Sequence, residues 1–375
     1  MKLSLFPLAG LVPALLIVSA HGQAVGVPVL STPGSATWLS EITSTGTRLV
    51  FTITGDTVLD WGQFNLGSGN ELIFDFIGGT SVTNMLNGTS TNKIAGTVTS
   101  NGDVGFFSPN ADLKVTGTVT ANNVTLATMN VDPQAFNSGG TFTMTAGSGS
   151  TLTVSGTVSA TNGSVVLAGP TVRIPASGLI QAADAVRIGG GRAVTVETSG
   201  SGRHLKVASG EGFVLHMGTS SAPRIEIAAG NEINVGGLLN TGSSNNRIFL
   251  EVGKGGQILR EGSGLMVGRT KIDGKYLKDG YAIDPDTDDM RSAVNTSTVK
   301  MPALKRPDGS SVSTARTLVN DAPMSASADS GRDRKRANAQ VASNDNKAKP
   351  ILKATSLFGM RGVTVASSEK KKEKR

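Results

Sequence analysis

Few side chains in this sequence have the type and spacing to do chemistry. There is no cysteine, which excludes disulfides, thiolate metal sites and cysteine nucleophiles. His204 and His216 lack metal-ligand spacing to each other, and Asp184 with Arg187 and Glu226 reads as isolated charges. Cleaving a glycan requires paired carboxylates, or a carboxylate with Lys and Arg, on one face. The sequence therefore favours a non-enzymatic protein without metal or cofactor, and a carbohydrate-active enzyme stays open as the alternative.

The composition indicates the elements that must position these residues. The chain has 375 residues, of which 48 are Gly and 17% are charged. Charged residues are scarcer than in an average domain, and Gly is about twice as frequent. Short alternations of Val, Thr and Ile with small polar residues are broken by Gly, Asn and Ser, which is typical of strands and turns. These features exclude a helical bundle or coiled coil and predict an all-β fold.

A glycine that opens an alternating pentad recurs along the chain. The clear cases are Gly96-Thr-Val-Thr-Ser, Gly117-Thr-Val-Thr-Ala, Gly156-Thr-Val-Ser-Ala, Gly178-Leu-Ile-Gln-Ala and Gly237-Leu-Leu-Asn-Thr, with a weaker one at Gly256. The intervals are 21, 39, 22, 59 and 19 residues. If they hold one, two, one, three and one turns, the mean period is about 20 residues, which is typical of a solenoid.

The solenoid that fits best is a right-handed parallel β-helix of about 20-residue coils. Val, Ile, Leu and Ala then point inward, Thr and Ser point outward, and Gly or Asn takes left-handed corners between strands. Residues 25–272 have room for about 11 or 12 coils stacked at about 4.8 Å. A leucine-rich horseshoe lacks its Leu and Asn ladder here, and a β-sandwich does not explain the fixed interval.

The two ends of the chain differ from this middle. Residues 1–24 have the charged start, apolar run and Gly22-Gln23-Ala24 ending of a signal peptide, with cleavage expected after Ala24. Residues 273–375 predict a low-complexity, largely disordered tail. Residues 331–375 hold 13 Lys and Arg against 4 Asp and Glu. Such a tail could touch anionic polymers, or it could be a solvated terminus without a partner.

Several short motifs follow one another in residues 57–130. They are Trp61-Gly-Gln-Phe64-Asn65-Leu, Glu71-Leu-Ile-Phe74, Asn84-Met-Leu-Asn87-Gly88, Ile94-Ala-Gly96-Thr-Val, Ser108-Pro109-Asn110-Ala111 and Leu126-Ala-Thr128-Met-Asn130. In order and spacing this stretch resembles the N-terminal secretion domain of filamentous haemagglutinins and high-molecular-weight adhesins, the exoproteins of two-partner secretion. Two departures from the family pattern are Ser108, where its turn motif begins with Asn, and Ala111, where it has Gly.

This resemblance implies a division of the chain and a partner. Residues 25–170 would form the filamentous-haemagglutinin-like secretion domain, and residues 171–272 would continue its β-helix. The partner would be an outer-membrane β-barrel transporter with periplasmic polypeptide-binding domains. The protein would pass through the periplasm of a Gram-negative-type bacterium and be secreted or held at the cell surface.

The resemblance also implies recognition or folding roles for particular residues. These are Trp61, Phe64, Asn65, Asn84, Asn87, Gly88, Ser108, Pro109 and Asn110. An adhesin of this type would meet a host or neighbouring cell surface, or its glycans. Two alternatives stay open, a polysaccharide-lyase-like β-helix enzyme and a matrix or scaffold protein that binds anionic surface polymers through its tail.

Overall fold

The computed structural model describes most of the residues between the predicted signal peptide and the predicted tail. The described residues are 25–31, 35–197, 204–243, 247–262, 264–278 and 281–282, with the backbone of four strands at 299–300, 317–318, 351–357 and 360–366. The predicted signal peptide and most of the predicted tail lie outside these residues. Among the described residues no helix has the length and hydropathy of a membrane-spanning segment.

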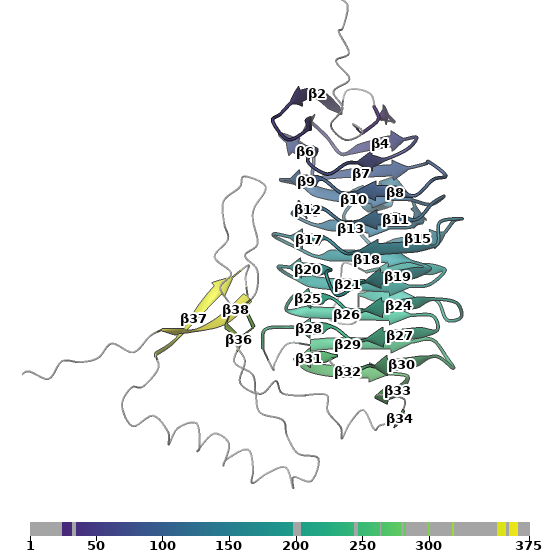
Figure 1. The fold of residues 1–375 in the computed structure, drawn as a ribbon, viewed down its shortest axis with the longest axis vertical. Helices are drawn as coiled ribbons and strands as arrows, with labels where there is room; N and C mark the ends of the chain where they lie inside the picture. Colours follow the sequence, from purple (N-terminus) through teal and green to yellow (C-terminus); the bar gives the residue numbers. More distant parts are fainter. Residues whose placement is uncertain are drawn as a thin grey trace, which may run out of the picture.

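Three ten-stranded sheets wind around one axis and form a parallel β-helix (Figure 1). Sheet A holds β1 (Val29–Leu30), β4 (Thr57–Trp61), β7 (Ser81–Leu86), β10 (Asp103–Phe107), β13 (Val124–Ala127), β18 (Val165–Gly169), β21 (Ala185–Gly190), β26 (Arg224–Ala229), β29 (Arg247–Val252) and β32 (Arg269–Asp273). Sheet B holds β2 (Ala36–Ile42), β3 (Thr47–Ile53), β6 (Glu71–Phe76), β9 (Thr97–Ser100), β12 (Thr118–Ala121), β17 (Thr157–Ala160), β20 (Leu179–Ala182), β25 (Thr219–Ser221), β28 (Leu238–Asn240) and β31 (Leu265–Val267). Sheet C holds β5 (Asn65–Leu66), β8 (Asn92–Ile94), β11 (Leu113–Val115), β16 (Thr151–Val154), β19 (Thr171–Ile174), β24 (Phe213–His216), β27 (Glu232–Val235), β30 (Gln257–Arg260), β33 (Lys275–Lys278) and β34 (Tyr281–Ala282).

The predicted alternation places the core inside the coils. Val98, Val119 and Val158 stand in register on β9, β12 and β17, and all three are fully buried. Their neighbours Thr97 and Thr118 stack on the outer face of the same strands. Side chains of a strand alternate between its two faces, so a Thr-Val-Thr pattern buries one residue in two. The expected β-helix is confirmed by this parallel stacking.

The expected number of coils is wrong. Thr118 pairs directly with Thr157, so the 39-residue interval holds one turn rather than two. Leu179 pairs with Thr219 and Thr219 with Leu238, so the 59-residue interval holds two turns rather than three. The described residues therefore make nine coils, each with one strand from each sheet, and the stacking continues past residue 272 through β33.

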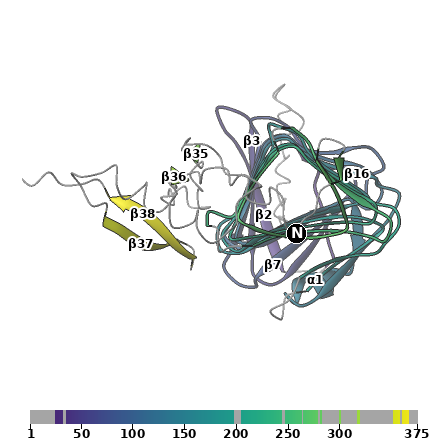
Figure 2. The ribbon, with the colours of Figure 1, turned by 90° about the horizontal axis from the view of Figure 1, so that it is seen from below.

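The extra residues in the long intervals form a second layer outside the coil. One segment leaves after β13 and contains β14 (Met129–Val131), α1 (Pro133–Asn137) and β15 (Phe142–Ala146); the other leaves after β21 and contains β22 (Ala193–Val196) and β23 (Leu205–Val207). Together their strands form an antiparallel four-stranded sheet, sheet D. Figure 2, which looks along the solenoid, shows α1 outside the face to which β7 belongs.

Sheet D covers the outer face of sheet A. A second apolar core lies between them, formed by Phe107, Ala127, Met129, Phe136, Phe142, Met144, Val166, Ala168, Val194, Val196, Leu205 and Ala228. The end of α1 is tied to the second coil because the hydroxyls of Ser81 and Thr83 donate to Asn137 Oδ1 at 2.9 and 2.7 Å. Sheet A is thus buried on both faces over its middle strands.

The repeated glycines occupy close backbone contacts rather than left-handed corners. A Cβ on Gly117 would lie 2.0 Å from the Gly96 carbonyl oxygen, and one on Gly156 would lie 2.0 Å from that of Gly117. None of these three glycines has a positive φ. Gly218 belongs to the same column, because a Cβ there would lie 2.4 Å from the Gly178 oxygen. Glycine is needed here because successive corners stack backbone on backbone.

The two ends of the solenoid are built differently. At the N-terminal end β1 and β2 run antiparallel to β4 and β3 and close the first coil. At the other end β34 turns back along β33. Further along the chain β35 (Val299–Lys300) pairs with β36 (Thr317–Leu318), and β37 (Ile351–Leu357) pairs with β38 (Met360–Ala366) as an antiparallel hairpin. The predicted disorder of residues 273–375 otherwise falls on residues outside the described part.

Candidate functional site

The structure brings the predicted site residues together at one corner of the solenoid. The corner joins sheet A to sheet C, and the first three coils supply residues 61–65, 84–88 and 108–110 to it (Figure 1). The Asn87 N–H donates to the Trp61 carbonyl oxygen at 2.8 Å, and Asn110 Nδ2 donates to the Asn87 carbonyl oxygen at 3.3 Å. We call these stacked corners the corner column.

The aromatic members of the corner column lie inside the coils. Trp61 is 1% exposed and Phe64 is fully buried, with ring centroids 5.0 Å apart in an edge-to-face pair. Phe64 also contacts Phe106 of the third coil at 5.4 Å, and Trp61 contacts Phe51 at 6.0 Å. Edge-to-face pairs stabilise beyond the area that they bury. These rings fill the leading end of the core and cannot contact a partner in the folded protein.

Asn84 is a polar side chain inside the apolar core. It is fully buried, and in the sheet it lies between Leu59 and Phe106. Its Oδ1 accepts from Trp61 Nε1 at 3.0 Å, and its Nδ2 donates to the Gly105 carbonyl oxygen at 3.0 Å. A buried polar group is tolerated only when it is hydrogen-bonded. Asn84 therefore links three successive coils from within.

A second buried asparagine, Asn92, was not among the predicted residues. Its Oδ1 accepts from the Phe64 N–H at 3.0 Å, and its Nδ2 donates to Ser108 Oγ at 2.9 Å. Ser108 Oγ in turn donates to the Ala111 carbonyl oxygen at 2.6 Å. The alternation of Asn92-Lys-Ile94 is the signal that could have found it, because Asn92 shares the inward face with Ile94.

The remaining predicted residues lie nearer the surface. Asn87 and Asn110 are exposed, and Asn65 and Gly88 are half-buried. Gly88 has no room for a side chain, since a Cβ there would lie 2.3 Å from the Gly62 oxygen. Pro109 is buried, although it stands in the turn. The corner column thus has a buried set, which holds the coils together, and an exposed set, which a partner could reach.

The corner column continues into the segment that leaves the coil after β13, which we call the first extruded segment. The Gly149 N–H donates to the Pro109 oxygen at 2.8 Å, and Ser148 Oγ donates to the Asn110 oxygen at 3.2 Å. Asp112 Oδ1 accepts from the N–H of Thr151 at 2.8 Å. A carboxylate or amide of one coil that accepts backbone N–H groups of the next fixes the register between coils. The motif Ser108-Pro109-Asn110 is therefore a stacked turn with neighbours on both sides.

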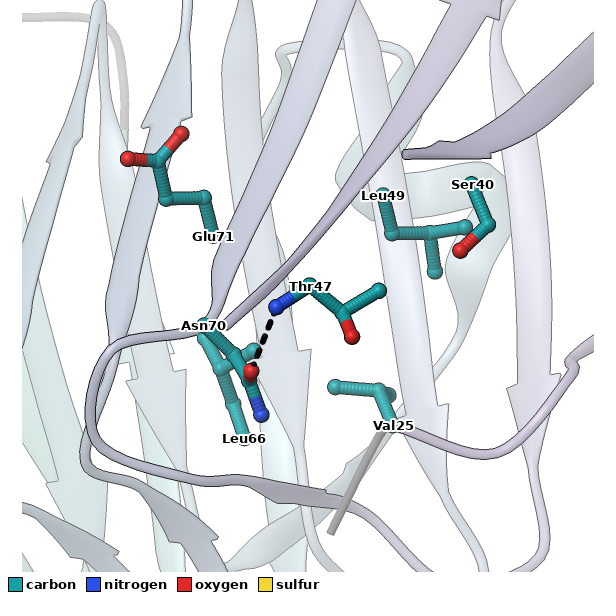
Figure 3. Close-up of a pocket in the computed structure, with 7 residues that line it drawn as sticks. All are labelled: Val25, Ser40, Thr47, Leu49, Leu66, Asn70 and Glu71. Atoms are coloured by element: carbon teal, nitrogen blue, oxygen red, sulfur yellow. Dashed lines mark hydrogen bonds between the residues drawn. The ribbon is translucent and has the colours of Figure 1, made fainter. Parts of the chain in front are cut away.

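A small pocket lies at the leading end, under the β2–β3 hairpin (Figure 3). It is lined by Val25, Ser40, Thr47, Leu49, Leu66, Asn70 and Glu71. Asn70 Oδ1 accepts from the Thr47 N–H at 2.9 Å, as Figure 3 shows. The pocket has a volume of about 40 Å³, which suits one or two water molecules. It is too small to bind a sugar.

The charges that the sequence presents as isolated meet at the edge of sheet D. Arg187 and Glu226 are register partners on β21 and β26, and Asp184 lies 3.7 Å from Arg187. Glu226 is buried and accepts from the backbone N–H groups of His204 and Leu205 at 3.0 and 2.9 Å. Burial lowers the pKa of the Arg187 guanidinium, and the Glu226 carboxylate opposes that shift. This cluster holds β23 against the solenoid.

His216 lies in the core. It is fully buried, and its Nε2 lies 2.7 Å from Ser220 Oγ. Burial lowers its pKa to about 4, so the ring is neutral at pH 7. Within the described residues no three His, Asp or Glu side chains lie close enough together to hold a metal ion.

Comparison with known proteins gives structural neighbours only. No protein-family model matches the chain, and no curated protein matches it. The secretion domain of HMW1 from Haemophilus influenzae is similar in fold, with a TM-score of 0.46 and 16% identity over 68% of this chain and 74% of that chain. The secretion domain of filamentous hemagglutinin has a TM-score of 0.37 and 16% identity over 69% of this chain and 98% of that chain.

Proposed function

We propose that this chain is a non-enzymatic exoprotein of the two-partner secretion type. Its partner is a β-barrel transporter of the outer membrane whose periplasmic domains bind the unfolded chain. The chain enters the periplasm behind a signal peptide of residues 1–24, crosses the outer membrane and winds into its solenoid outside. It then stays at the cell surface, where it acts as an adhesin-like protein.

The observation that carries this proposal is the corner column at the leading end. Three motif segments that begin 23 and 24 residues apart meet in the first three coils, joined by the Asn84 and Asn92 networks. A chain that emerges N-terminus first would complete these coils first, and each later coil needs only the one before it as a template. The absence of cysteine leaves no covalent link to hinder passage as an extended chain.

The two sets of the corner column take different parts in this mechanism. The buried set, Trp61, Phe64, Asn84, Ser108 and Pro109, nucleates folding outside the membrane. The exposed Asn87 and Asn110, with the half-buried Asn65 and Gly88, offer backbone and amide groups for recognition. Recognition and folding can therefore be separated by mutation.

The experiment is secretion in a Gram-negative host with and without a transporter of this class. Full-length chain should reach the medium or cell surface only when the transporter is present. The double variant Asn87→Lys/Asn110→Lys should reduce export, while Asn162→Lys, an exposed corner asparagine of the fifth coil, should leave it unchanged. Retention of the wild-type chain in the periplasm beside a working transporter would refute the proposal.

The basic tail supplies retention at the surface in this proposal. Residues 331–375 carry a net charge of +9 and would hold the protein on anionic surface polymers. Retention should fall when salt is raised, and deletion of 331–375 should remove that salt dependence. Salt-independent retention of the deleted protein would assign retention to the solenoid and its glycan or cell-surface contacts.

A further inference from the structure

At the N-terminal end of the solenoid, one edge of an apolar strand has no partner among the described residues. β2 is the last strand of sheet B, and no described strand pairs with its outer edge. Along it Trp38, Leu39 and Ile42 are 37%, 51% and 67% exposed. Val27, just before β1, and Val29, within it, are 75% and 68% exposed. A long, exposed, apolar edge is a template for pairing with another strand. A strand that paired with this edge would remove that template.

The charge of the solenoid differs between its two ends. Residues 25–76 hold five carboxylates and Arg48 as the single basic residue among them, a net charge of −4. Residues 247–278 hold seven Lys and Arg against three Asp and Glu, a net charge of +4. A cationic segment is therefore attracted to the N-terminal end and repelled by the C-terminal end.

The chain contains a segment that suits this end. β37 and β38 have seven residues each, like β2, and in the described backbone they pair only with each other. They lie within residues 331–375, whose net charge is +9. An isolated two-stranded hairpin is marginally stable in water and gains from a further strand. The hairpin and the outer edge of β2 therefore each have backbone groups that a further strand could pair with.

The chain is long enough for its own hairpin to reach β2. Sixty-eight residues separate β34 from β37. The β35–β36 pair lies within this segment, and the 48 residues on its two sides, 283–298 and 319–350, span up to about 160 Å when fully extended. Nine coils at the spacing of parallel strands are about 40 Å long. Docking within one molecule is therefore feasible, and its effective concentration exceeds that of a second copy in dilute solution.

We propose that hairpin β37–β38, with the basic sequence around it, adds to the outer edge of β2 in the same chain. The main-chain bonds form by strand addition, as in other strand-to-edge complexes. The hairpin itself carries a net charge of +2, which the carboxylates of residues 25–76 attract, and the exposed apolar side chains of β2 become covered. The remaining net charge of +7 in residues 331–375 stays available to anionic surface polymers. The two ends of the polypeptide are joined in this arrangement.

The test uses the absence of natural cysteine in the full-length chain. One variant carries Ser40→Cys in β2 and Ser356→Cys in β37, and the matched control carries Lys271→Cys in β32 with the same Ser356→Cys. Ser40 and Lys271 are both exposed, and Lys271 is the nearer to the hairpin in sequence. Disulfide formation is followed by non-reducing peptide mapping at low protein concentration.

The Ser40–Ser356 pair should close within one chain about ten-fold faster than the control pair, because docking raises its effective concentration. Higher salt should slow it, and Glu41→Lys/Asp75→Lys should slow it about three-fold at low salt, whereas Glu211→Lys in a distant coil should not. An equal or faster rate for the Lys271 pair would overturn the proposal. So would a Ser40–Ser356 disulfide that forms only between two chains.

Discussion

Asn84 shows how a single side chain ties the first three coils together. It accepts from Trp61 of the first coil and donates to Gly105 of the third, from a position with apolar neighbours in the sheet. The indole N–H of Trp61 and the carbonyl of Gly105 are buried, so water cannot replace the Asn84 amide as their hydrogen-bond partner. The stability of the leading end therefore depends on an amide at this position.

Replacing Asn84 with Leu should lower the free energy of unfolding by about 1–3 kcal/mol, because the buried Trp61 Nε1–H is left without an acceptor. Urea denaturation followed by circular dichroism measures this. Asn162→Leu, at an exposed corner, should change the value by less than about 0.5 kcal/mol. Equal effects of the two substitutions would show that the Asn84 network contributes nothing beyond an ordinary surface contact.

His216 makes the folded protein sensitive to acid. Its pKa is about 4 when folded, against about 6.5 in an unfolded chain. The unfolded state therefore binds the proton first, and stability that is complete above pH 6.5 is lost as the pH falls toward 4, by about 3 kcal/mol.

His216→Gln keeps a hydrogen-bonding group beside Ser220 and removes the titration. Between pH 7 and pH 4 the unfolding free energy of the variant should fall by about 3 kcal/mol less than that of the wild type. Unfolding curves at several pH values measure the difference. Parallel pH profiles for the two proteins would contradict a buried neutral histidine.

At the scale of elements, the column of glycines sets how closely successive coils stack. Gly96, Gly117 and Gly156 follow one another at the corner before sheet B, each with its backbone against the next. The Thr118 and Thr157 N–H groups donate to the Gly96 and Gly117 oxygens at 3.0 and 2.9 Å. A side chain in this column would separate two coils.

Gly156→Ala should cost about 3 kcal/mol of stability, because its Cβ meets a backbone oxygen that cannot move without displacing the neighbouring coil. The matched control is Gly55→Ala, where no atom lies within 4 Å of the added Cβ. Urea midpoints of the two variants compare the costs. A Gly156→Ala protein as stable as Gly55→Ala would mean that the corners have freedom to separate.

The sequence predicts the strands well and their connections poorly. The pentads at Gly96, Gly117 and Gly156 are local patterns, so their alternation identifies the inward valines directly. The 39-residue interval is close to twice the period, and length alone cannot distinguish two coils from one coil with an extruded segment. Gly218 was missed for a related reason, because its strand, Thr-Ser-Ser, has no apolar alternation.

The same limit applies to the candidate site. The motif residues could be chosen from their order, but alternation shows which of them are buried only when the strand boundaries are known. Asn92 looks like an ordinary loop residue until its strand is recognised. Arg187 and Glu226 are 39 residues apart and become neighbours only because an extruded segment leaves the coil between them.

At the scale of the whole molecule, the two ends of the solenoid differ in charge and in how they are closed. Its first coils are acidic, closed by antiparallel strands and filled with aromatic rings, whereas its last coils are basic. Association between molecules, and between the ends of one molecule, should therefore depend on salt. The neutral middle coils should take little part in it.

Sheet D has a consequence for how the chain folds as it is synthesised. β15 pairs with β22, and the partners Thr145 and Ala193 are 48 residues apart. In a chain that emerges gradually, one edge of β15 has no partner until β22 appears, and about two further coils form in the meantime. Slower emergence of the chain during that interval prolongs a partly folded intermediate with an unpaired strand edge, which is prone to aggregate. A ribosome pause between residues 147 and 192 would therefore be the moment of greatest risk of misassembly.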